Sequence, residues 1–227
     1  MLEHFEVLCL TTFVYLTGYK KRDPRSSNPS YSAGTQTLLI MAAPPKPVRH
    51  SQTTITELMI PAYANFGGKI HGGILLSLMD KVAYACASKH AGAYCVTVTV
   101  DKVEFLQPVE VGELVSLHAS VNYVGRTSLV VGIRVEALNV KTHIVKHTNS
   151  SFFTMVAKGD DDRPAEVPPL ILETAEDVKR FIEAMRVRQI KQAMREQMDD
   201  AKSHIDIAHA AELLKKERCI ITYQPNV

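Results

Sequence analysis

Residues 65–90 form a predominantly apolar segment that opens with a glycine-rich turn. After Gly72 and Gly73, apolar residues occupy nearly every helical face, so the pattern predicts a helix enclosed by other structure rather than one lying on a surface. One carboxylate, Asp80, stands in the middle of this segment. Because an ionised carboxylate is rarely buried without a partner, we expect Asp80 to be either a strained structural feature or a catalytic group.

Runs rich in β-branched and apolar residues lie on both sides of this helix and predict strands. Turn residues separate these runs, for example at residues 125–128. One helix with consecutive antiparallel strands describes an α+β fold, in which a curled sheet surrounds the helix. The five expected strands cover residues 50–59, 94–105, 114–124, 129–140 and 143–157.

The N-terminal segment differs in composition from the rest of the chain, with serine- and proline-rich stretches that are typical of linkers. We expect a disordered extension over residues 1–48, with a short membrane-associating arm as the alternative reading. The central domain is then expected over residues 49–160.

A proline-rich linker at residues 164–169 separates this central domain from a helical tail. Thr174, followed by an acidic first turn, predicts the N-cap of a helix that runs to about residue 199. A second helical run is expected over residues 203–217, so residues 161–227 form a linker and C-terminal helices. Acidic residues balance the basic ones, which favours packing or subunit contact over membrane or nucleic-acid binding.

The composition describes an ordinary globular protein of 227 residues, with 46% hydrophobic residues, 22% charged residues and a net charge of +2. A net charge this small favours neither a nucleic-acid surface nor an acidic interaction tail. The four cysteines lack CxxC spacing, so we expect reduced thiols in a cytoplasmic protein and no metal site. Uninterrupted apolar runs are shorter than the roughly 18 residues of a membrane span, so no stable membrane insertion is expected.

The N-terminus of the central helix is a candidate site for a developing negative charge. Gly72 and Gly73 offer backbone N–H groups there, where the helix dipole favours an oxyanion. Asp80 lies about 12 Å further along the axis, so one small carbonyl cannot contact both groups of the same helix. If two such helices run antiparallel across a two-fold axis, Asp80 of one faces Gly72 of the other. The spacing therefore implies a homodimer with composite sites.

Several motifs stand together, in the order Asn65, His71-Gly72-Gly73, Asp80 and the strand segment of residues 96–101. In this order and spacing they resemble the hotdog-fold acyl-CoA thioesterases, in particular the subgroup of bacterial YciA-type enzymes and brain-type acyl-CoA hydrolases. The resemblance covers about residues 49–157 and leaves the N-terminal segment and the C-terminal helices outside it. It also includes residues 105–108, 111–113 and 124–128.

The resemblance implies a hotdog fold, a curved antiparallel sheet wrapped around one long helix, here with a C-terminal helical extension. It also implies hydrolysis of acyl-CoA to free fatty acid and CoA, with no cofactor, since the CoA belongs to the substrate. Asp80 would attack the thioester carbonyl or activate a water to attack it. Asn65 of a second copy would bind that water or the carbonyl, and Gly72, alone or with Gly73, would stabilise the oxyanion. Whether Asp80 is a general base or a nucleophile stays open.

Further positions are candidates for binding the CoA part of the substrate. The turn of Gly125, Arg126, Thr127 and Ser128 offers backbone N–H groups and a guanidinium to phosphates, and the resemblance implies nucleotide binding near it. His71 is expected to be structural or to line the pocket. Since dimers in this group often assemble further, the resemblance also implies a trimer of dimers, which is a hexamer.

Two other functions are compatible with such a fold. An (R)-specific hydratase would pair the aspartate with a histidine five residues later, where this chain has Ala85. A non-catalytic or regulatory module would hold acyl-CoA or a nucleotide at subunit interfaces, and it is the alternative to hydrolysis. The site residues also have structural alternatives, namely a salt bridge from Asp80 to Lys81, an Asx turn at Asn65 and close helix packing at the glycines.

Overall fold

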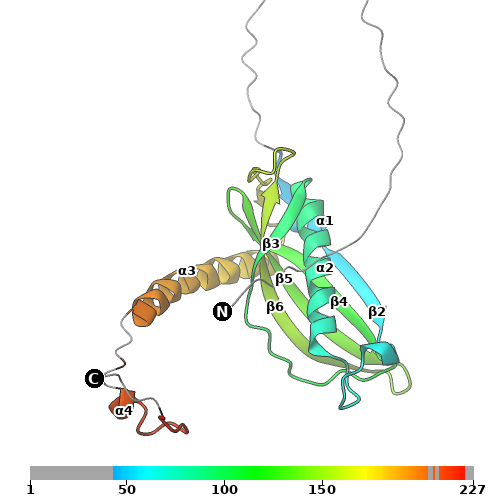
Figure 1. The fold of residues 1–227 in the computed structure, drawn as a ribbon. Helices are drawn as coiled ribbons and strands as arrows, with labels where there is room; N and C mark the ends of the chain where they lie inside the picture. The colour runs from blue at the N-terminus through cyan, green and yellow to red at the C-terminus, as the bar shows by residue number, and fades with distance from the viewer. Residues whose placement is uncertain (1–42, 204–206, 208–209, 223–227) are drawn as a thin grey trace, which may run out of the picture. The chain divides into compact units, whose positions relative to one another are not determined.

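In the computed structural model the chain is described for residues 43–203, 207 and 210–222. Five antiparallel strands form one sheet in the order β2-β4-β5-β6-β3, which curls around helix α2 (Figure 1). This arrangement confirms the expected α+β fold, with a curved antiparallel sheet around one long helix. The bounds are Thr53–Leu58 for β2, Tyr94–Val100 for β3, Leu114–Val124 for β4, Ser128–Asn139 for β5, Ile144–Lys158 for β6 and Gly72–Ala91 for α2.

Helix α2 begins and ends where its sequence provides caps. His71 Nδ1 accepts a hydrogen bond from the Gly73 N–H at 2.9 Å, and Gly92 ends the helix with a left-handed φ of 70°. One face of the helix packs on the sheet, where each fully buried Leu, Val or Met side chain contributes roughly 1.5–3 kcal/mol. This face consists of Leu75, Leu78, Met79, Val82, Ala83, Cys86, Ala87 and His90.

The opposite face of α2 is exposed. Leu76 is 37% exposed and Tyr84 is 42% exposed, and Asp80 lies between them on the same face. The expectation of a helix enclosed on all sides is therefore wrong for a single chain, because the sheet covers only one side of it. A long apolar segment with one uncovered face needs a further partner to bury it.

Four of the predicted strands are found with small shifts at their ends, and β4 has the expected bounds. Strand β2 starts later than expected because a short helix, α1 at Val48–Ser51, precedes it. Strand β3 ends at Val100, before the expected end at residue 105, and the segment up to β4 has no regular structure beyond isolated bridges and turns.

A β-bulge in β3 changes which way its side chains point. Thr97 pairs with Met155, whereas Thr99 pairs with the adjacent residue Thr154, so Val98 is the extra residue on this strand. Side chains alternate along a regular strand, and the extra residue interrupts that alternation. As a result Thr97 points toward α2, while Thr99 points toward the opposite face of the sheet.

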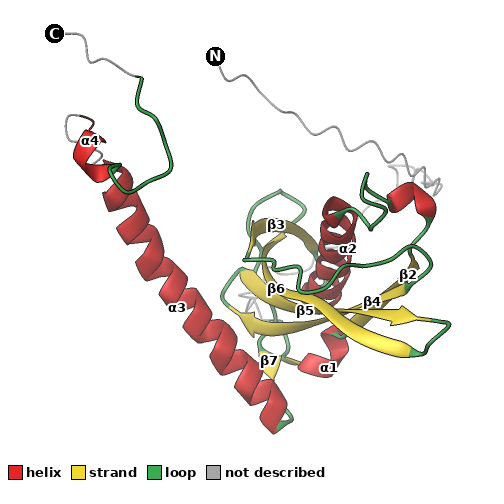
Figure 2. Ribbon diagram, turned by 90° about the horizontal axis from the view of Figure 1, so that it is seen from below, coloured by secondary structure: helices red, strands yellow, loops and turns green. Residues whose placement is uncertain are grey.

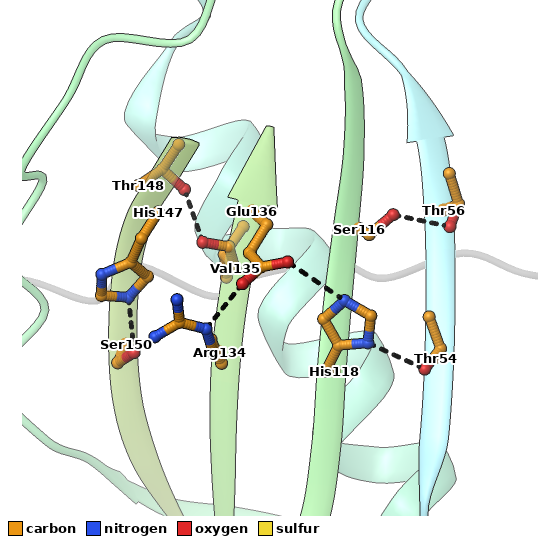
Figure 3. Close-up of polar contacts among 10 residues, drawn as sticks. All are labelled: Thr54, Thr56, Ser116, His118, Arg134, Val135, Glu136, His147, Thr148 and Ser150. Atoms are coloured by element: carbon orange, nitrogen blue, oxygen red, sulfur yellow. Dashed lines mark hydrogen bonds and ion pairs between the residues drawn. The ribbon is translucent and has the colours of Figure 1, made fainter. Parts of the chain in front are cut away.

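The two faces of the sheet differ in composition. The inner face, which packs on α2, buries apolar side chains that include Val115, Leu117, Val131, Val135 and Phe153. The outer face carries polar side chains that contact one another within and across strands (Figure 3). Among these contacts are Thr54 Oγ1 to His118 Nδ1 at 3.1 Å, Arg134 Nε to Glu136 Oε1 at 2.7 Å and His147 Nε2 to Ser150 Oγ at 2.8 Å.

Helix α3, Ala175–Ser203, lies along part of this outer face (Figure 2). The rings of Tyr123 and Phe181 have centroids 5.0 Å apart, and Arg188 Nη1 donates to the Tyr123 hydroxyl at 3.0 Å. The predicted N-cap is confirmed, because Thr174 Oγ1 accepts from the Asp177 N–H at 3.1 Å and Asp177 Oδ2 accepts from the Thr174 N–H at 3.0 Å.

The two ends of the described chain correct two expectations. Residues 46–48 were assigned to the disordered extension, but Lys46–Pro47 form strand β1, which pairs in parallel with β7 at Leu170–Ile171. Residues 1–42 of the expected extension lie outside the described residues. In the expected second helical run, the described residues contain only the short helix α4, Ala210–Leu213, and residues 204–206 and 208–209 are not described.

None of the helices in the described residues is long and apolar enough to cross a membrane. The same part of the chain contains no group of three or more His, Cys, Asp or Glu side chains that could hold a metal ion.

Candidate functional site

Asp80 lies in the middle of the exposed face of α2 and accepts a hydrogen bond from strand β3. Thr97 Oγ1 donates to Asp80 Oδ1 at 2.7 Å, and the same hydroxyl lies 3.2 Å from Met155 Sδ. One carboxylate oxygen is thereby oriented, while Oδ2 has no hydrogen-bond partner in the described residues. The alternative of a salt bridge to Lys81 is not found, so Asp80 is held by a neutral donor and keeps one oxygen for another ligand.

Thr97 is the residue that the sequence analysis missed. It lies in the strand segment that carries the family resemblance, where its polar side chain fitted the alternating pattern of a strand. Residues 94–97 pair in regular register, so Thr97 faces α2 as the buried Cys95 does, and the bulge at Val98 turns Thr99 to the other face. No feature of a single sequence reveals a bulge of this kind, so the sequence does not tell which threonine faces the helix.

Asn65 forms an Asx turn in the loop before α2. Its Oδ1 accepts from the Gly67 N–H at 2.8 Å and from the Lys69 N–H at 3.2 Å, and its own N–H donates to the Lys69 carbonyl at 2.7 Å. The structural alternative for Asn65 is thus present. This turn is compatible with a role in substrate binding. The two bonds to Oδ1 fix the amide, and Nδ2 has no acceptor in the described residues.

The N-terminus of α2 has one backbone donor in use and one available. The Gly73 N–H donates to His71 Nδ1, so His71 caps the helix. This is a structural role, one of the two roles expected for His71. The Gly72 N–H has no acceptor within the described part of the chain. A Cβ at Gly72 would lie 3.1 Å from Phe105 Cζ, so close packing against this ring also favours glycine there.

The turn between β4 and β5 lies two strands away from Thr97. The Gly125 N–H donates to the Ser128 carbonyl at 2.8 Å, and the exposed Arg126 guanidinium has no ion-pair partner among the described residues. Leu129, the residue after this turn, pairs with Met155, which pairs with Thr97. The turn is therefore about 10 Å from Thr97, at the usual spacing of adjacent strands.

A second polar cluster lies on the outer face, where Thr54, His118 and Glu136 follow the order of a nucleophile, a base and an acid (Figure 3). His118 Nε2 lies 3.9 Å from Glu136 Oε2, which is too long for a hydrogen bond. Without that bond the imidazole is not oriented as a general base. The cluster therefore lacks the acid–base contact of a catalytic triad.

Two buried cysteines in this region are not nucleophiles. Burial raises the pKa of the Cys86 thiol to about 12 and also raises the pKa of Cys95. Both thiols stay protonated at neutral pH, and the nucleophilic form of cysteine is the thiolate. Their core role agrees with the burial of both side chains.

Comparison with protein families gives a match to the thioesterase superfamily over residues 67–154, which include α2 and most of the sheet. Protein VdlD of Helicobacter pylori is 41% identical over 137 residues, which cover 60% of this chain and 78% of that protein. The cytosolic acyl coenzyme A thioester hydrolase of Rattus norvegicus is 30% identical over 146 residues, which cover 63% of this chain and 38% of that longer protein.

Solved structures give the same result. An acyl-CoA hydrolase of Staphylococcus aureus, in complex with butyryl coenzyme A, coenzyme A and coenzyme A disulfide, matches with a TM-score of 0.65 and 27% identity, covering 71% of this chain and 98% of that one. An apo-hexameric acyl-CoA thioesterase matches with a TM-score of 0.64 and 34% identity, covering 67% of this chain and 97% of that one. By sequence and by fold, the chain belongs to the thioesterase superfamily and is a hotdog-fold relative of the acyl-CoA thioester hydrolases.

Proposed function

We propose that the protein hydrolyses acyl-CoA thioesters to a free carboxylic acid and CoA, at sites formed between two copies of the chain. The observation that carries this proposal is the Thr97–Asp80 hydrogen bond, which holds a carboxylate with one free oxygen on an exposed face of α2. Family membership supports the reaction class, and the contacts described above support the roles of individual residues.

The spacing of three polar residues supports these roles. The S. aureus hydrolase has also been solved with alanine in place of one asparagine, one aspartate and one threonine, at positions 28, 43 and 60 of its chain. Those positions are 15 and 17 residues apart, from 43 − 28 and 60 − 43. Asn65, Asp80 and Thr97 have the same two separations in this chain.

A second copy of the chain would complete the site. Strand β3 is at the edge of the sheet, and its Tyr94, Val98 and Val100 are 58%, 60% and 43% exposed. The rings of Tyr94 and Tyr84 have centroids 5.9 Å apart, so the strand edge and the exposed face of α2 are adjacent. An exposed edge with apolar side chains is a template for pairing with another chain. Antiparallel α2 helices would then bring Asp80 of one copy to Gly72 of the other.

In the proposed reaction, Asp80 Oδ2 takes a proton from water or attacks the thioester carbonyl itself. Asn65 Nδ2 from the second copy donates to the water or to the carbonyl oxygen, and the Gly72 N–H stabilises the oxyanion. Collapse of the tetrahedral intermediate breaks the C–S bond and releases the CoA thiolate. If Asp80 acts as a base, the water oxygen becomes part of the free acid and the proton on Asp80 passes to the thiolate. If Asp80 is the nucleophile, collapse leaves a mixed anhydride on Asp80, which a water molecule then hydrolyses to the free acid. In this reaction Gly72 would bind the oxyanion rather than Gly73, because the Gly73 N–H already donates to His71 Nδ1.

The turn of Gly125, Arg126, Thr127 and Ser128 would bind phosphates of CoA, since the Arg126 guanidinium is exposed and free of ion pairs among the described residues. We further propose a trimer of dimers, supported by the hexameric relative, and a cytoplasmic location, supported by the cytosolic rat relative. Sedimentation analysis tests the assembly, and an active monomer would contradict the composite site.

The reaction is tested by free-thiol release from acyl-CoAs of short to long chain length. Wild type should turn over at least one of them, and Asp80→Asn should lower kcat by at least roughly 100-fold, as expected for a positioned acid–base group. Asp160→Asn, a change on an exposed turn, is the matched control and should leave kcat unchanged. Equal rates for Asp80→Asn and wild type would remove Asp80 from the mechanism. Tight acyl-CoA binding without turnover would favour the binding module.

A further inference from the structure

Asp101, the first residue after β3, has a buried carboxylate. Its side chain is 9% exposed, and neither carboxylate oxygen accepts a hydrogen bond from the described residues. Within this part of the chain, the only cation in ion-pair contact with it is the Lys191 ammonium group of α3. A buried carboxylate is strongly unfavourable without a partner, so the position of Asp101 depends on Lys191.

Lys191 is itself fixed against the sheet by the turn of α3 that precedes it. Arg188 Nη1 donates to the Tyr123 hydroxyl, and the guanidinium lies 5.5 Å from the centroid of the same ring. One turn earlier, Ala184 is 2% exposed. The region of α3 that carries Lys191 is therefore packed on the outer face and is not a free helix in solvent.

The segment that contains Asp101 contacts the proposed site at both of its ends. Four residues before Asp101, the Thr97 hydroxyl donates to Asp80. Four residues after it, the Phe105 ring packs against Gly72. Between these ends the backbone of Asp101 is held by its N–H bond to the Phe152 carbonyl at 2.9 Å. The side-chain contact with Lys191 is the link from this segment to α3.

From these contacts we infer that Lys191 and Asp101 form a positioning pair, through which the C-terminal helix holds Thr97 in contact with Asp80. Neither residue touches the substrate, and both act through the Thr97 hydroxyl. The inference rests on the proposed thioesterase function. It gives α3, which lies outside the residues 67–154 that match the thioesterase superfamily, a role in the reaction.

Free-thiol release by full-length variants tests this pair. Lys191→Met keeps the length of the side chain and removes its charge, and it should lower kcat by up to about 10-fold, the loss expected when the Thr97 hydrogen bond to Asp80 is absent, with little change in KM. Lys191→Arg should restore most of the activity, because it restores the charge. Lys202→Met, on the exposed end of α3, is the matched control and should behave as wild type.

A double-mutant cycle separates positioning from a general loss of structure. In a Thr97→Val background, Lys191→Met should have no further effect on kcat, since the hydroxyl through which it acts is gone. An equal loss in both backgrounds, or unchanged kcat in Lys191→Met, would overturn the inference. If Lys191→Met does not fold, the double variant Lys191→Met/Asp101→Asn, which buries no unpaired charge, takes its place in both arms of the cycle.

The wild-type baseline separates this inference from the function on which it rests. Wild type without turnover of any acyl-CoA would remove both. Wild type with turnover, together with a variant that does not couple to Thr97, would remove only the positioning pair.

Discussion

The inner face of the sheet buries apolar side chains against α2, whereas the outer face carries polar pairs within and across strands and supports α3. The outer face carries the polar contacts drawn in Figure 3, including an imidazole between a threonine and a glutamate. The proposed site lies on the other side of the sheet, where one carboxylate and one hydroxyl meet. The comparison teaches that a single well-oriented pair on an uncovered helix face is better evidence of chemistry than a dense network of solvated charges.

The largest effect should come from neighbouring phenylalanines on β6 that point to opposite faces. Phe153 is fully buried on the inner face, so Phe153→Ala should lower the free energy of unfolding by about 3–5 kcal/mol. Phe152, half-buried on the outer face, is the matched control and should cost less than half as much when changed to alanine. Thermal and denaturant unfolding at one fixed protein concentration measure both. Equal costs would mean that the two faces contribute alike to stability.

A smaller effect should separate the two threonines on either side of the bulge. Thr97→Val removes the hydrogen bond to Asp80 with little change in volume and should lower kcat about 10-fold, since a bond to a charged group contributes about 1.5 kcal/mol or more. Thr99→Val, on the outer face, should leave kcat near the wild-type value. Steady-state kinetics with one acyl-CoA decide the matter, and a loss of similar size in both variants would contradict the assignment of faces.

The smallest effect should come from the pH dependence of stability, through His90 at the end of α2. Burial lowers the pKa of this imidazole below its ordinary 6.5, and its Nε2 contacts the Pro168 carbonyl at 2.9 Å. The unfolded chain therefore takes up a proton at a higher pH than the folded chain. Stability should be full above pH 6.5 and fall as the pH drops toward the lowered pKa, by at most about 1.4 kcal/mol per pH unit for this one group.

Unfolding measured between about pH 5 and pH 8, the range in which histidine titrates, checks this dependence. His90→Gln should make the curve flatter on its acid side. A curve that is equally steep in the His90→Gln variant would assign the acid sensitivity to other groups.

Much of the fold could be predicted from the sequence because its signals are local. The apolar run from Gly72 onward predicts the central helix, and the run of apolar and β-branched residues after the turn at residues 110–113 predicts β4 with its observed bounds. The N-cap at Thr174 was predicted for the same reason, since a capping residue and an acid three positions later act within one turn. Asp80 and Asn65 could be selected as candidates from residue type and order alone.

Other features depend on contacts between distant segments and could not be predicted. The strand of residues 46–47 exists because it pairs with residues 170–171, far along the chain. The exposure of one face of α2 depends on how far the sheet curls around it. The use of the Gly73 N–H by the His71 side chain depends on a side-chain conformation, and of these two glycines only Gly72 keeps a donor without an acceptor in the described residues. The pairing of Lys191 with Asp101 likewise needs the packing of α3.

The extra residue at Val98 makes the length of β3 as important as its composition. In a regular strand the hydroxyl at residue 97 and the carboxylate at residue 101 would face the same side of the sheet, because they are four positions apart and side chains alternate. The extra residue offsets this repeat by one, so the hydroxyl faces α2 while the carboxylate faces α3. One short strand thereby serves opposite sides of the sheet, and the number of its residues, not only their types, decides which side each one reaches.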